Sequence, residues 1–185
     1  LGGDLKYTAG GITTTATGYY FNQGIWNQTT AIQDYENHYN ALNRIGAGLG
    51  VYHLTGDPSD DNITANEKLI LKFATAVRLS ALSLRSDGHR TTWIPGATFL
   101  FNGVNTVLTG DINGLDVVGT EFTFAFGGNH PDQFYLGGIT VSTVPKPLIA
   151  SKPPISAVPE PSNYALMFAG LGAMCLIGNR RKKRS

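Results

Sequence analysis

Residues 68–84 read KLILKFATAVRLSALSL, and apolar side chains occupy every second position over most of this stretch. In an extended chain, Leu69, Leu71 and Phe73 point to one side, and the two lysines point to the other. The alternation shifts by one position after Ala81. A β-bulge inserts one extra residue into a strand and absorbs such a shift. We therefore predict a half-buried β-strand that is bulged near Ala81.

Shorter segments on both sides show the same kind of signal. Thr98–Phe101 and Val104–Leu108 flank Asn102-Gly103, a dipeptide that favours a two-residue hairpin turn because both turn positions need positive φ. The other predicted strands are Ile12–Phe21, a segment around Phe122, Phe124 and Phe126, and Gln133–Val144 with a local bend at Gly137-Gly138.

One segment has helical spacing instead. Ile32, Tyr35, Tyr39, Leu42 and Ile45 recur every three or four residues, which indicates a short amphipathic helix or an ordered loop over Thr30–Arg44. Elsewhere, short strands are separated by Gly, Asn and Asp. The sequence therefore predicts an all-β fold, an antiparallel β-sandwich of the jelly-roll or immunoglobulin-like type.

The charge of the chain is unevenly distributed. Its 185 residues include 14 Lys and Arg and 13 Asp and Glu. Five of the basic residues lie at 180–184, and every acidic residue except Glu160 precedes residue 159, so the chain before residue 159 carries nine basic and 12 acidic residues. This part is slightly acidic, which argues against nucleic acid as a partner. The single cysteine, Cys175, excludes an intrachain disulfide.

Proline marks the domain boundary. Six of the nine prolines lie between Pro145 and Pro161. Because proline fixes φ and lacks an N–H group, such a segment forms an extended, stiff spacer. We predict one domain over residues 1–144, a proline-rich linker over 145–158, and a separate C-terminal segment over 159–185.

This C-terminal segment has three parts: Pro159, Glu160 and Pro161, then an uncharged apolar run over 164–178, then Arg180, Arg181, Lys182, Lys183 and Arg184. The apolar run would be about 22 Å long as a helix, which is short against a hydrocarbon core of roughly 30 Å. We predict one transmembrane helix over 164–178. The basic cluster should stay on the cytoplasmic side of the membrane.

The three parts together resemble the PEP-CTERM sorting signal of Gram-negative bacteria. The resemblance is carried by Val158–Ser162, Tyr164–Met167, Ala169–Gly172 and the basic cluster. It implies recognition by an exosortase, a membrane enzyme thought to process such tails in bacteria that make exopolysaccharide. It also implies a cell-envelope protein that passes through the inner membrane to the cell surface or extracellular matrix. The chain begins with leucine and shows no signal-peptide pattern, so an exported protein would have lost its signal peptide or be truncated here; we expect a missing export signal.

An acidic stretch is the candidate metal site. Asp57, Asp60 and Asp61 lie within five residues, and Glu67 follows closely. Calcium prefers hard oxygen ligands from loops and adjoining strands, although this spacing differs from that of an EF-hand. Two interpretations stay open, a calcium site and a solvated turn.

Aromatic residues suggest carbohydrate as a partner. Trp26 and Trp93 have polar neighbours in the sequence, so they are the candidates for stacking against sugar rings, and burial in the core is the alternative. No nucleophile elbow, zinc-binding HExxH motif or phosphate-binding loop is found, so the sequence does not predict an enzyme. Two of the four histidines, His89 and His130, lie two residues from an aspartate, Asp87 and Asp132 respectively, which leaves a His/Asp pairing in space open.

The function expected from these features is that of an exported surface or matrix protein. Sorted by an exosortase, it would serve a structural or adhesive role in exopolysaccharide or biofilm. The alternative is an extracellular carbohydrate-binding module or hydrolase that the same tail delivers.

Overall fold

The computed structural model describes residues 3–34, 46–53 and 61–145, and these form nine β-strands with no helix among them. All described strands belong to one compact unit, Leu1–Pro145. The strands are β1 (Leu5–Ala9), β2 (Ile12–Asn22), β3 (Ile25–Asp34), β4 (Gly48–Tyr52), β5 (Glu67–Arg85), β6 (Thr98–Phe101), β7 (Val104–Val107), β8 (Asp111–Ala125) and β9 (Tyr135–Thr143). Every pair of neighbouring strands is antiparallel.

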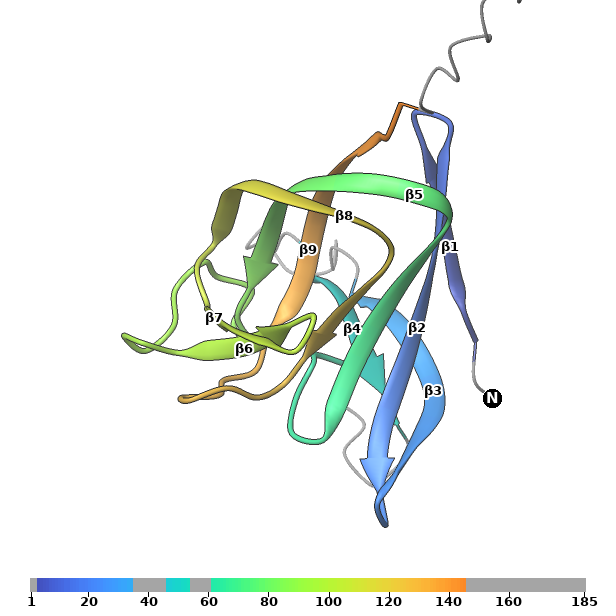
Figure 1. The fold of residues 1–185 in the computed structure, drawn as a ribbon. Helices are drawn as coiled ribbons and strands as arrows, with labels where there is room; N and C mark the ends of the chain where they lie inside the picture. The colour runs from blue at the N-terminus through green and yellow to red at the C-terminus, as the bar shows by residue number, and fades with distance from the viewer. Residues whose placement is uncertain (1–2, 35–45, 54–60, 146–185) are drawn as a thin grey trace, which may run out of the picture. The chain divides into compact units, whose positions relative to one another are not determined.

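Five of these strands close into a barrel in the order β2-β3-β4-β9-β5, because β5 also pairs with β2. The remaining strands extend the same sheet, β1 beside β2, and β8, β6 and β7 beyond β5. Figure 1 shows how β5 makes the closure possible, since it arches from the side of β2 to the side of β9. The predicted all-β class is confirmed, whereas the predicted sandwich is not confirmed by this strand order.

The bend in β5 coincides with two irregularities in its pairing. Its register against β8 shifts between Lys72 and Val77 and again between Leu79 and Ala81. The second shift is the bulge predicted near Ala81. Because of this bulge, the apolar side chains before and after Ala81 all point into the core. The buried ones are Leu69, Leu71, Phe73, Val77, Leu79, Leu82 and Leu84.

Phenylalanines are the largest fully buried side chains of the core. Phe99, Phe122, Phe124 and Phe134 are fully buried. The rings of Phe99 and Phe134 pack with their centroids 4.9 Å apart, in the tilted geometry that aromatic pairs prefer. These residues come from β6, β8 and the segment before β9, so they hold the extension of the sheet against the barrel.

The predicted hairpin at Asn102-Gly103 is confirmed. Phe101 pairs with Val104, and φ is 48° at Asn102 and 80° at Gly103, as a two-residue turn of this type requires. The predicted bend at Gly137-Gly138 is also present, because Ser83 pairs with Gly138 while the next residue of β5 pairs with Leu136.

The helix considered for Thr30–Arg44 is wrong for its first five residues. β3 continues to Asp34 and pairs with β4 over this length. The cause is the neighbouring strand, since Ala31 is buried opposite Val51 in the barrel wall and Thr30–Asp34 pair with β4. Residues 35–45 lie outside the described part of the chain.

Candidate functional site

Two loop segments at one end of the barrel enclose a groove of about 460 Å³. The first follows β5 and contributes residues 86–88 and 92–95, and the second precedes β9 and contributes residues 132–133. Backbone hydrogen bonds fix both segments. The N–H of Ser86 donates to the carbonyl of Arg90 at 2.8 Å, and the N–H of Asp132 donates to the carbonyl of Thr98 at 3.2 Å.

Trp93 is held rigidly in this groove. Its indole Nε1–H donates to the backbone carbonyl of Gln133, 3.2 Å away, and the half-buried ring packs against the core. Beside it, Ile94 leaves 68% of its surface exposed. A fixed aromatic ring with an apolar neighbour at the mouth of a groove is suited to stacking against a ligand.

The polar groups of the groove are acidic or neutral. Asp87 and Asp132 contribute carboxylates, and Ser86, Thr92 and Gln133 contribute neutral polar groups. The Asp132 carboxylate accepts a hydrogen bond from the N–H of Gln133 at 2.9 Å, which fixes its position. No lysine, arginine or histidine of the described residues lines the groove.

Behind Asp87 lies a buried polar residue, Asn62. Its side-chain Nδ2–H donates to the Asp87 carboxylate at 3.1 Å, while its Oδ1 has no hydrogen-bond partner within the described residues. Gly50 allows this arrangement, because a Cβ at that position would lie 1.8 Å from the carbonyl oxygen of Asp61. β4 can therefore lie close enough for the N–H of Val51 to donate to the carbonyl of Asn62, 3.0 Å away.

A second group of side chains adjoins Asn62. The Tyr135 hydroxyl donates a hydrogen bond to the Asp61 carboxylate. Burial, this hydrogen bond and the negative charges of Asp61, Asp34 and Asp87 raise the pKa of Tyr135, so its phenol stays neutral and remains a donor. His89 stands edge-on to the Tyr135 ring, with 5.7 Å between the ring centroids.

One of the two histidines considered for a His/Asp pairing, His89, does lie beside an aspartate. Its Nε2 lies 3.4 Å from the carboxylate of Asp34, which accepts the N–H of Ala47 at 2.8 Å. The sequence drew attention to Asp87, two residues away, but the contact is made with an aspartate at the end of β3 instead. No local pattern links residues so far apart in the chain.

The calcium candidates fall into three groups. Asp57 and Asp60 lie outside the described residues. Asp61 contacts Tyr135, whereas Glu67 is only 1% exposed and accepts the N–H of Thr64 at 3.0 Å. The other oxygen of Glu67 lies 3.3 Å from His53 Nδ1. Among residues 3–34, 46–53 and 61–145, no three His, Asp or Glu side chains are arranged to hold a metal. The calcium site stays a prediction.

The two candidate tryptophans have different surroundings. Trp93 lies in the groove, while Trp26 lies on β3 with 40% of its surface exposed and with the Lys68 ammonium above its ring. The structure thus places one tryptophan beside carboxylates and the other beside a cation. The sequence had suggested both residues, and it had missed that Asp87 and Asp132 line the groove with Trp93.

The sorting residues Pro159, Glu160 and Pro161 and the basic cluster at 180–184 lie outside the described residues. Within the described part of the chain, no helix is long and apolar enough to cross a membrane.

Comparison with known proteins yields no relative: no protein-family model, no curated protein and no solved structure matches this chain. Its function has to be inferred from the chemistry of the groove and from the pattern of the C-terminal segment.

Proposed function

We propose that this chain is an exported surface or extracellular-matrix protein whose barrel binds neutral polysaccharide in the Trp93 groove. The observation that carries this proposal is the fixed indole of Trp93 in a groove with two carboxylates and several neutral polar groups. The groove has a volume of about 460 Å³, within the range of roughly 300–1,000 Å³ found for small-ligand sites.

The groove suits a sugar for two reasons. One face of a pyranose ring carries C–H groups and can stack on the indole, while the hydroxyl groups around the ring can donate to Asp87 and Asp132. A carboxylate sugar would bring a third negative charge beside these two without a basic residue in the lining. The groove therefore favours neutral sugars.

The C-terminal segment supports the other half of the proposal. Its Pro-Glu-Pro triplet, apolar run and basic cluster resemble a PEP-CTERM signal, so we infer that an exosortase sorts the chain. The inner membrane would hold it briefly through residues 164–178, and the cell surface or matrix would be its destination. Binding to polysaccharide there gives an adhesive or structural role.

The proposal is tested by titrating the full chain with soluble cello-, laminari- and chito-oligosaccharides in a calorimeter. At least one should bind, and Trp93→Ala should weaken that binding about tenfold, which corresponds to about 1.4 kcal/mol. Asp87→Asn should also weaken it, whereas Asp111→Asn, an exposed aspartate outside the groove, should leave it unchanged. Equal affinities for Trp93→Ala and Asp111→Asn would contradict the proposal.

Hydrolysis of the bound polysaccharide is a second candidate function, because Asp87 and Asp132 line the same groove. Most glycosidases use two carboxylates that flank the scissile bond. New reducing ends that form with the native chain but not with Asp87→Asn or Asp132→Asn would identify a hydrolase. Binding without new reducing ends would identify a binding module.

A further inference from the structure

Three aromatic side chains and one lysine gather on the outer face of the barrel. On β2, Tyr19 and Phe21 are two residues apart and so point to the same side of the sheet. Phe21 pairs with Trp26 of β3, and Tyr19 pairs with Lys68 of β5, so all four side chains share this face. We call these four residues the Trp26 platform.

Two side chains of the platform are exposed, while Tyr19 and Lys68 are partly buried. Phe21 and Trp26 each leave 40% of their surface exposed, and their ring centroids lie 5.3 Å apart. The hairpin beneath them is fixed by a turn with positive φ at Gln23 and Gly24, and the N–H of Phe21 donates to the carbonyl of Asn66 at 2.7 Å. Grouped, exposed aromatic side chains on a rigid support are typical of interaction sites.

A cation stands within the platform. The Lys68 ammonium lies 4.1 Å from the centroid of the Trp26 ring and 5.3 Å from that of Tyr19. Burial lowers the pKa of Lys68, and the charge of Glu121 opposes this effect. Glu121 itself lies 3.5 Å from Lys72. An anion that approached Lys68 would replace part of the hydration that the ammonium has lost.

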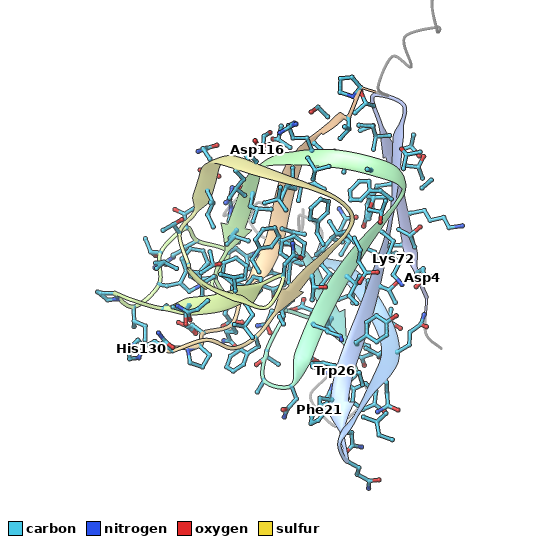
Figure 2. The ribbon with its side chains drawn as sticks, viewed as in Figure 1. Asp4, Phe21, Trp26, Lys72, Asp116 and His130 are labelled. Carbon is cyan, nitrogen blue, oxygen red and sulfur yellow. The ribbon has the colours of Figure 1, made fainter. Side chains whose placement is uncertain are left out.

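We propose that the Trp26 platform is a second sugar site, which binds acidic sugars: the ring of a uronic acid stacks on the exposed aromatic rings, and its carboxylate pairs with Lys68. The ammonium of Lys68 supports this assignment, since it gives the platform a positive charge. In Figure 2, Phe21 and Trp26 lie beside the β2–β3 turn, well apart from His130, which precedes the groove residues 132–133. The platform shares no residue with the groove, so it does not depend on the function proposed above.

The two tryptophans of the chain allow the sites to be observed separately. Its ¹⁵N–¹H spectrum should contain two indole N–H signals, one for each tryptophan, and Trp26→Phe assigns them. The full chain is titrated with tetragalacturonate and, in parallel, with the fully methyl-esterified tetramer, which has nearly the same shape but no charge. We expect the acid to shift the Trp26 signal and to bind at least ten times more tightly there than the ester.

Two variants on the same strand separate charge from stacking. Lys68→Gln removes the ammonium of the platform and should make the affinities for acid and ester equal. Lys72→Gln, which removes the neighbouring ion-paired cation, should keep most of the preference for the acid. An unshifted Trp93 signal verifies that each variant is folded. Equal affinities for acid and ester in the native chain, an unshifted Trp26 signal, or a preference that survives Lys68→Gln would overturn the proposal.

Discussion

Tyr135 shows how a single residue joins the core to the groove end of the barrel. Its ring is buried, and its hydroxyl donates to Asp61 among three negative charges. Burial, the hydrogen bond to Asp61 and the nearby carboxylates oppose ionisation of the Tyr135 phenol. Folding therefore favours the neutral form of Tyr135, and its ionisation is coupled to stability.

This coupling predicts the direction of a pH effect. The pKa of Tyr135 is raised above the ordinary tyrosine value of about 10, so above that pH the unfolded chain loses a proton that the folded chain keeps. Stability contributed by this residue should be complete below about pH 10 and should decline at higher pH. Thermal melting of the native chain and of Tyr135→Phe between pH 8 and 11.5 measures the effect. The native chain should lose more stability than the variant, and parallel declines would show that Tyr135 is not responsible.

The β6–β7 hairpin is a pair of strands whose register is specified by the turn between them. Asn102 of this turn also contacts β8, since its side-chain oxygen accepts the N–H of Thr123 at 2.8 Å. The turn thus fixes the register of β6 and β7 and also ties them to β8.

Gly103→Ala should destabilise the chain by about 1–2 kcal/mol, because a Cβ is unfavourable at positive φ. No atom lies within 4 Å of such a Cβ, so backbone conformation alone would be responsible. Gly88→Ala is the matched control, with equally open surroundings and no positive φ, and it should be neutral or stabilising by up to about 1 kcal/mol. Urea denaturation of both variants checks the difference, and an equal cost at the two positions would contradict it.

With two differently charged sugar sites and an exosortase signal, the protein would bind polysaccharides together in the extracellular matrix. The groove would take neutral sugars and the Trp26 platform acidic ones, so one chain could bridge two kinds of polysaccharide. The C-terminal segment would determine where this bridging occurs.

Sorting can be tested through the Pro-Glu-Pro triplet in the native bacterium. If an exosortase reads it, Pro159→Ala with Pro161→Ala should keep the chain in the inner membrane. Pro153→Ala with Pro154→Ala, a matched pair in the linker, should still reach the surface. Fractionation and mass spectrometry distinguish these outcomes. Surface delivery of both variants would show that the triplet is not the recognised feature.

Local patterns predicted β2, β5, β6, β7, β9 and the end of β8, but not β1, β3 or β4. The alternation in 68–84, the bulge near Ala81 and the turn at Asn102-Gly103 each follow from residues that are close in sequence, because side-chain period and turn φ are properties of the backbone itself. The helical spacing over Thr30–Arg44 led to a wrong prediction for Thr30–Asp34 because pairing with a distant strand decides the structure there. Pairing with β4 overrides the helical spacing as far as Asp34.

The all-β class and most strand positions therefore follow from the sequence alone, and the sequence also proposed Trp26 and Trp93 as candidate binding residues. Three-dimensional packing was needed to show that β5 closes a barrel against β2, that Trp93 lines one groove with Asp87 and Asp132, and that Lys68 lies above the Trp26 ring. The β2–β5 pairing joins residues up to 59 positions apart, from Thr14 to Phe73. Their proximity depends on strand register and on closure, which long-range packing of the core sets and no local pattern encodes.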